Sequence, residues 1–202
     1  MIFNPFFFAL LYFMKLFITL LFGFLPLFIY GNTKMYEKTP VDQIRVIELP
    51  SRIALEAEYP GSYFDEGNGL FRKLFRYIST YDISMTTPVE GDVEPAKMRF
   101  FVGAGDLKKR FFSTSEVKVR KLEPLLVAAI GIRGGYSQER FSANKSKLDQ
   151  WLANNTEYLA VGNPYGVYWN GPFVPGPFKR SEVHLPIEFK KSISSPSELD
   201  KP

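Results

Sequence analysis

Few side chains in this sequence of 202 residues could carry out metal or nucleophilic chemistry. There is no cysteine, which excludes disulfides, thiolate metal sites and a cysteine nucleophile. There is one histidine, His184, so a single chain cannot assemble a metal site from several histidines. In the strand-like stretch EVHLPI, side-chain alternation places His184 on the same face as Glu182 and Pro186. A lone histidine on a strand is more often a structural residue than a metal ligand. We therefore interpret His184 first as a structural residue and only second as a metal ligand.

The sequence signatures of common enzyme classes are absent. The chain contains no GxGxxG, GxxxxGK[ST], HExxH or GxSxG motif. The formal net charge is +4, but the basic residues are interspersed with acidic ones, so nucleic acid binding has little support. With 46% hydrophobic and 23% charged residues, the chain can bury the core of one domain.

The first thirty residues form an apolar segment. From Pro5 to Tyr30 the apolar run is long enough to span a bilayer of ~30 Å, although Lys15 in its middle would be costly there. A start at Met14 instead gives MKLFITLLFGFLPLFIYG, the pattern of a signal peptide, with Gly31 as a small residue before a polar stretch. We therefore expect residues 1–31 to be a signal peptide or N-terminal membrane anchor with Met14 as the true start. The following domain, residues 34–190, is then exported.

Hydrophobic periodicity predicts an α+β domain with two amphipathic helices and an antiparallel sheet. We expect the helices at residues 66–80 and 138–154, where apolar side chains recur at helical spacing. The expected strands cover residues 44–49, 52–59, 98–103, 116–122, 125–136, 157–162 and 182–189, and another strand starts after Pro88 in MTTPVE. Along 52–59 the apolar residues share one face and Arg52, Glu56 and Glu58 the other. The polar tail, residues 191–202, is expected to be disordered.

The two predicted helices belong to an internal repeat. An offset of 74 positions pairs Pro50 with Pro124, and it also pairs Leu74 with Leu148. Each half reads as a proline-led strand, a turn containing glycine and an amphipathic helix. We interpret this as two pseudo-symmetric βα repeats, with a sheet curved into a distorted barrel.

The order of five motifs resembles the SOUL haem-binding protein family. These motifs are GNGLFRKLFRYI, ISMTTPVE, MRFFVG, IGIRGGYS and NGPFVPGPFKRSEVHLPI, which together run from about residue 43 to residue 187. The resemblance implies a distorted antiparallel barrel flanked by two long helices and built from two pseudo-symmetric halves. The same architecture is similar to gyrase-inhibitor-like effector-binding modules, which hold small amphipathic ligands.

In this family the first helix and the proline-rich loop look like the walls of a shallow apolar cleft for non-covalent haem or another tetrapyrrole. The resemblance assigns two ring contacts and one propionate partner to the helix, and three contacts to the loop: Phe71 and Phe75, Arg76, and Phe173, Val174 and Lys179. The residues Phe71 and Phe75 could equally be ordinary core, and Arg76 a solvated helix residue.

The resemblance leaves the axial ligand of the haem iron open. His184 stands where family members often carry an aromatic residue, and the first half of the domain has no histidine. Either His184 is the ligand, or haem binds weakly through apolar contacts, or Tyr59, Tyr63 or Met85 ligates the iron.

Two other functions stay open at this point. Gyrase-inhibitor-like relatives include hydrolases with a Tyr and Glu pair, for which this chain offers Glu90, Glu182, Tyr136 and Tyr168. The domain could also be an envelope interaction module that has the fold without a ligand. We expect an exported, non-enzymatic haem binder, periplasmic, secreted or anchored in the membrane through residues 1–31, that does not bind nucleic acid.

Overall fold

The computed structural model describes residues 36–171 and 173–190, so the predicted leader and tail lie outside the described residues. This part contains helices α2 (Leu70–Thr80) and α3 (Gln138–Ala153) and the short 3-10 helices η1 (Ala104–Asp106) and η2 (Gly176–Phe178). Its strands are β1 (Ile44–Leu49), β2 (Arg52–Tyr59), β3 (Val89–Asp92), β4 (Ala96–Phe101), β5 (Lys118–Leu122), β6 (Leu125–Arg133), β7 (Tyr158–Ala160), β8 (Tyr165–Tyr168) and β9 (Arg180–Phe189). No helix within the described ranges is long and apolar enough to cross a membrane.

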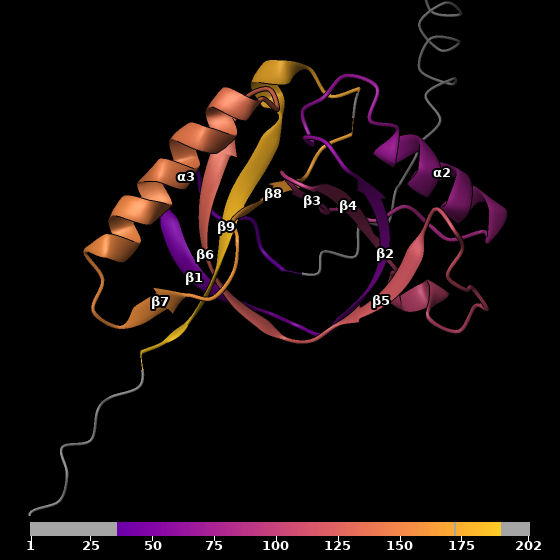
Figure 1. The fold of residues 1–202 in the computed structure, drawn as a ribbon, viewed down its shortest axis with the longest axis horizontal. Coiled ribbons are helices and arrows are strands. Elements are labelled where there is room, and N and C mark those ends of the chain that lie inside the picture. Colours follow the sequence, from indigo (N-terminus) through magenta and orange to yellow (C-terminus); the bar gives the residue numbers. More distant parts are fainter. Residues whose placement is uncertain (1–35, 172, 191–202) are drawn as a thin grey trace, which may run out of the picture. The chain divides into compact units, whose positions relative to one another are not determined.

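The strands form one curled antiparallel sheet. Their order is β1-β6-β9-β8-β3-β4-β2-β5, and β7 pairs separately with β9. Among the described residues, β1 and β5 are the two edges and do not pair with each other, so the sheet is a curled half-barrel, an open form of the distorted barrel that the resemblance implied. Helix α3 lies outside β6 and β9, and α2 lies outside β2 and β4 (Figure 1). The predicted α+β class is confirmed.

Helix α2 begins later than predicted because glycines precede it. Gly67 and Gly69 have φ angles of 74° and 70°. This left-handed conformation is incompatible with a right-handed helix, so the helix can start only after Gly69. Asn68 Oδ1 then accepts a hydrogen bond of 3.1 Å from the Leu70 amide. The buried stripe of the helix joins the core cluster on the outer face of β2 and β4 and consists of Leu70, Leu74, Tyr77 and Ile78.

Helix α3 covers the other half of the outer face. Ser137 caps it by accepting a hydrogen bond from the Arg140 amide. Phe141 and Leu148 are buried against a second cluster, which includes Ile130 of β6.

The charged face of β2 does not meet solvent. Alternation correctly separates Leu55 and Ala57, which pack under α2, from Arg52 and Glu56. However, Arg52 is only 6% exposed and Glu56 only 5%, because the sheet curls and this face becomes its inner, concave side. A polar face on a strand therefore marks the interior of the half-barrel here.

The predicted repeat fits the helices better than the strands. The offset of 74 pairs the buried Leu74 with the buried Leu148. It also pairs Leu55, on the outer face of β2, with Ala129, which lies on the inner face of β6 beside His184. An offset of 73 would instead pair Leu55 with Ala128, which lies on the outer face of β6. The duplication stays a prediction.

Candidate functional site

A cleft opens between α2 and the proline-rich segment that leads into β9. Its volume is about 220 Å³. Its wall is formed by side chains of α2, the MTTPV stretch, the outer faces of β3, β4 and β8, and the proline-rich segment: Tyr63, Phe71, Met85, Thr87, Val89, Met98, Tyr136, Tyr168, Asn170, Gly171 and Lys179. This arrangement is aromatic and apolar, with a single lysine among the residues that form it.

On the side of α2, partly exposed phenylalanine side chains form the surface of the cleft. Phe71 is 39% exposed and Phe75 is 50% exposed, and their rings stack with centroids 5.8 Å apart. Phe71 also meets the buried Phe100 edge-on, at 5.5 Å between centroids, so the sheet holds it in place. Neither helical phenylalanine is core, which leaves their faces available to a ligand.

Tyrosines form the base of the cleft. The rings of Tyr63 and Tyr168 stack in parallel, with centroids 5.3 Å apart. Gly91 makes this possible, because a Cβ at that position would lie 2.4 Å from the Tyr63 ring. Burial raises the pKa of both phenols, so they stay protonated near neutral pH.

The proline-rich segment is anchored by Tyr136. Its single hydroxyl proton is shared between the carbonyls of Asn170 and Arg180, each 3.1 Å from the phenol oxygen, which accepts from the Asn170 amide at 3.0 Å. The side chain of Asn170 in turn accepts from the Arg180 amide at 2.7 Å. The ammonium of Lys179 lies 4.9 Å from the centre of the Tyr136 ring. A cation is thus held at the edge of an aromatic cleft.

Met85 reaches the cleft because the MTTPV stretch is fixed at both sides. The Ser84 amide donates to Asp106 Oδ2 at 2.8 Å, and the Thr86 hydroxyl donates to the Phe101 carbonyl at 2.6 Å. Burial alone would raise the pKa of Asp106, but hydrogen bonds from Lys109 and Ser84 lower it below its usual value. Val89 then starts β3, as the sequence predicted.

The structure brings two of the predicted contacts, Phe71 and Lys179, into the same cleft. Phe75 lies one turn further along α2 and extends the aromatic surface. The Arg76 side chain is 63% exposed and bonds to Glu116 at 3.4 Å, away from the lining residues. In the loop, Phe173 is 97% exposed and Val174 half-buried, and neither lines the cleft.

His184 lies on the other side of the sheet from the cleft. Its side chain is fully buried on the inner side of the sheet. Its Nε2 is 2.9 Å from Glu182 Oε2, and its Nδ1 is 3.4 Å from the Tyr165 hydroxyl. Within the described ranges, no three His, Asp or Glu side chains come together as metal ligands. The structure therefore places this histidine in a structural network.

The other candidates divide between the two sides of the sheet. Tyr63 and Met85 line the cleft, whereas Tyr59 does not. The phenol of Tyr63 would have to ionise to ligate iron, and its burial opposes this, whereas the thioether of Met85 needs no deprotonation. Of the carboxylates considered for hydrolysis, Glu90 is bonded to Arg52, and Glu182 accepts from Thr39 and Trp169.

Sequence reasoning missed the strand residues that close the cleft from below. These are Val89, Met98 and Tyr168, all from the outer face of the sheet. The sequence could have indicated Met98 and Val89, because side-chain alternation along β4 and β3 assigns each of them to the outer face of the sheet. Tyr168 could not be found in this way, because strand β8 was not predicted.

Residues 34–186 match the family described as SOUL heme-binding protein. The chain belongs to this family. The SOUL family is a haem-binding family and not an enzyme family, in agreement with the absence of enzyme motifs. A comparison with curated protein sequences gives no significant match.

Solved structures of similar fold support the architecture. The EcmrR C-terminal domain has a TM-score of 0.57 at 16% identity, over 72% of this chain and 97% of that one. An uncharacterised conserved protein from Listeria innocua has a TM-score of 0.55 at 15% identity, over 74% and 94%. EcmrR in complex with DNA has a TM-score of 0.56 at 16% identity, over 72% of this chain, which spans only 57% of that one. At such identity these likenesses concern the fold alone.

Proposed function

We propose that this SOUL protein binds haem or a related tetrapyrrole reversibly and non-covalently, for carriage or buffering. The observation that carries the proposal is the aromatic cleft between α2 and the proline-rich segment, with Lys179 at its edge. A tetrapyrrole is a flat apolar plate with carboxylates at one side, so it needs an apolar slot and a nearby cation.

The residues present fit such a ligand, although the cleft is shallow. A volume of about 220 Å³ is below the roughly 300–1,000 Å³ of pockets that enclose a small molecule. Part of the plate would remain outside the cleft, against the exposed rings of Phe71 and Phe75. Lys179 would pair with a propionate, and Met85 would be the lining side chain able to ligate the iron without losing a proton. We expect micromolar or weaker affinity, because the contacts are few.

The experiment is a titration of residues 32–202 with hemin, followed through the Soret band. These residues contain every strand and both helices described above. We expect a saturable spectral change, weakened by Phe71→Ala. Absence of a saturable change would remove the haem proposal and favour an interaction module of the same fold.

We further infer that the domain arose by duplication and acts outside the cytoplasm. The strand order supports the first point: exchanging β1 with β5, β2 with β6, β3 with β8 and β4 with β9 reverses the order and leaves every neighbour unchanged. The apolar run of residues 5–30 supports the second. Fractionation of cells and the N-terminal sequence of the recovered protein would test export and cleavage after Gly31.

A further inference from the structure

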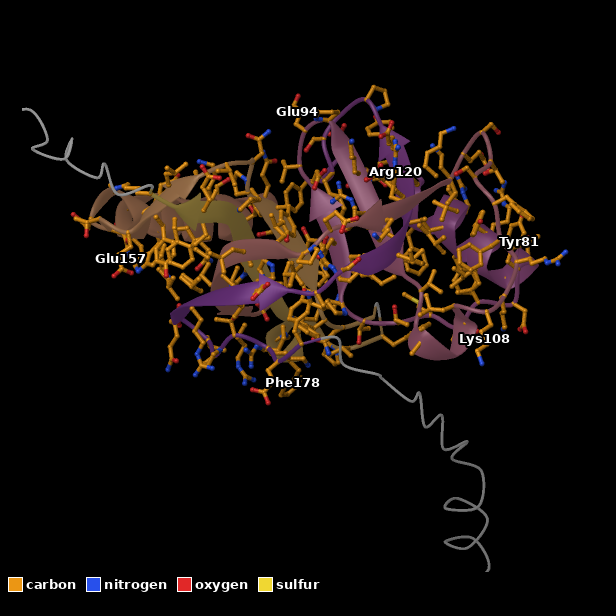
Figure 2. The ribbon with its side chains drawn as sticks, turned by 90° about the horizontal axis from the view of Figure 1, so that it is seen from below. Tyr81, Glu94, Lys108, Arg120, Glu157 and Phe178 are labelled. Carbon is orange, nitrogen blue, oxygen red and sulfur yellow. The ribbon has the colours of Figure 1, made fainter. Side chains whose placement is uncertain are left out.

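The proline-rich segment presents an apolar surface that the haem cleft does not use. Between Asn170 and Lys179 the sequence reads GPFVPGPF, without a polar side chain. Phe173 is 97% exposed and Phe178 is 65% exposed, and neither lines the cleft. Phe178 lies on the opposite side of the domain from Glu94 (Figure 2). Large apolar side chains that gather at a surface mark a site of interaction with a protein or a membrane.

This segment satisfies much of its own backbone hydrogen bonding. In η2, the Phe178 amide donates to the Pro175 carbonyl at 3.0 Å. The Lys179 amide donates to the Gly176 carbonyl at the same distance. Pro175 and Pro177 have no amide proton. Because few backbone donors need water here, moving the segment into a less polar environment costs little.

Basic residues surround the segment. Two other stretches contact it: the Arg180 guanidinium donates to the Thr39 carbonyl at 2.8 Å, and the Gly134 amide donates to the Lys179 carbonyl at 3.0 Å. Residues 36–40, 133–140 and 170–180 together contain five bases and two acids: Lys38, Arg133, Arg140, Lys179 and Arg180, and Glu37 and Glu139. The excess of positive charge favours an anionic partner.

Two of these bases face each other across the sheet. Arg133 of β6 stands directly opposite Arg180 of β9. Like charges in this position repel each other and destabilise the pair of strands. A phosphate beside them would relieve the repulsion, so the arginine pair also favours an anionic partner.

The chain enters the domain beside the proline-rich segment. Tyr36 meets Trp169, the residue before Asn170, edge-on at 5.3 Å between ring centroids. The Lys38 ammonium lies 5.1 Å from the centre of the Trp169 ring. The apolar run of residues 5–30 ends six positions before Tyr36, and six extended residues span roughly 20 Å. A bilayer that holds this run therefore lies near the proline-rich segment.

We propose that the proline-rich segment docks on the surface of an anionic lipid bilayer. Phe173 and Phe178 enter the boundary between head groups and acyl chains, and the basic residues around them contact lipid phosphates. Aromatic rings are favoured at this depth, and each cation near an anionic surface adds to the attraction. The nearby apolar run favours a bilayer over a second protein. This docking site is separate from the haem cleft, so neither proposal requires the other.

Vesicle co-sedimentation tests the preference for anionic lipid. Residues 32–202, which form a compact unit, are titrated without hemin with two kinds of vesicle. One contains phosphatidylglycerol and phosphatidylcholine in equal parts, and the other contains phosphatidylcholine alone. Binding to the mixed vesicles should saturate, weaken as salt rises and be about tenfold or more tighter than to phosphatidylcholine. No binding to the mixed vesicles, or equal binding to both kinds, overturns the proposal.

Matched substitutions test the residues. Phe173→Ser and Phe178→Ser should each weaken binding about fivefold or more, because the buried area of a phenyl ring is lost. Phe189 is 63% exposed at the other end of β9, so Phe189→Ser is the control and should change binding less than about twofold, since this ring gains no burial. Equal losses in Phe178→Ser and Phe189→Ser would contradict the docking site.

A second pair of variants tests the charge. Arg133→Glu should weaken binding about fivefold or more, because it places an acid next to the lipid phosphates. Lys121→Glu changes the net charge equally but lies with Glu94 on the concave side of the sheet. It should weaken binding less than about threefold, since only long-range charge effects remain. Equal losses in the two variants would show that net charge alone matters and would refute the assigned face.

A fluorescent label tests insertion directly. Because the chain has no cysteine, Phe173→Cys and Phe189→Cys each give a single site for a nitrobenzoxadiazole label. With mixed vesicles, the label at position 173 should brighten and shift to shorter wavelength, whereas the label at position 189 should not. An unchanged spectrum at position 173 would contradict insertion.

Two further measurements separate this proposal from its alternatives. In sedimentation equilibrium without lipid, a dimer that Phe173→Ser abolishes would show that a second copy covers the segment, and the bilayer proposal would fall. Phe173→Ser should leave hemin affinity unchanged, because Phe173 does not line the cleft. Since the vesicle and hemin titrations are independent, failure of one leaves the other standing.

Discussion

Charge reversal at Lys179 and at Arg76 separates the cleft seen in the structure from the helix edge that the sequence suggested. Lys179 lines the cleft beside Tyr136. Arg76 lies outside it and is 63% exposed. Both are single cations within one domain, so Lys179→Glu and Arg76→Glu change the net charge equally. A difference between them must come from position.

The magnitude follows from the setting of Lys179. An ion pair that is partly exposed contributes about 0.2–1 kcal/mol. Reversal replaces this attraction by a repulsion of similar size, so we expect a loss of about 0.4–2 kcal/mol in hemin binding. This corresponds to roughly twofold to thirtyfold weaker affinity. Arg76→Glu should change affinity less than about twofold, since only long-range charge effects remain.

The assay is the hemin titration at low and at high salt. The Lys179→Glu effect should shrink as ionic strength rises, because surface charge interactions are screened. Equal losses in both variants would show that only net charge matters. A larger loss in Arg76→Glu would show that the propionates lie along α2, and the proposed orientation of the ligand would be wrong.

Three further predictions concern the ligand and the stability of the fold. Met85→Leu should alter the Soret spectrum of the hemin complex if the thioether meets iron, and an unchanged spectrum would leave apolar contact alone. Gly131→Ala should destabilise the protein by about 2–4 kcal/mol in thermal unfolding, because a Cβ there would lie 2.3 Å from the Thr39 carbonyl, whereas Gly105→Ala meets open space and should not. Asp106→Asn should lower the free energy of unfolding by about 1–2 kcal/mol at pH 7. Because the pKa of Asp106 is lowered in the folded protein, its stabilising effect is present above the usual pKa and is lost as the pH falls through the lowered value. A stability difference between wild type and Asp106→Asn that persists at pH 2 would contradict this.

Much of the fold could be read from the sequence because its signals are local. Strands β1 and β2 have the predicted bounds, since charged residues recur within both apolar stretches and Pro50 separates them. The start of α2 was misplaced by four residues because the effect of Gly67 and Gly69 depends on their backbone angles. Strand β8, YGVY, was missed since it is short and fully buried, so no alternation of polar residues marks it.

The site was harder to predict because it depends on the curl of the sheet. The family resemblance correctly assigned Phe71 and Lys179 to the cleft. It could not show that Arg76 points away from the cleft, because this depends on the rotation of α2 about its axis. The burial of Arg52 and Glu56 could not be foreseen, since the same alternating pattern describes a sheet with one solvated face. His184 was assigned the correct face of its strand, yet that face lies inside the half-barrel.

The cleft and the concave interior of the half-barrel use opposite faces of the same strands. In β3, Val89 lines the cleft and its neighbour Glu90 lines the interior; in β4, Met98 lines the cleft and Arg99 the interior. Because successive side chains point to opposite sides of a sheet, each face can change by substitution without altering the residues of the other. A shift of either strand along its axis would move both sets together. Ligand-induced movement of β3 or β4 would therefore couple the two faces of the sheet.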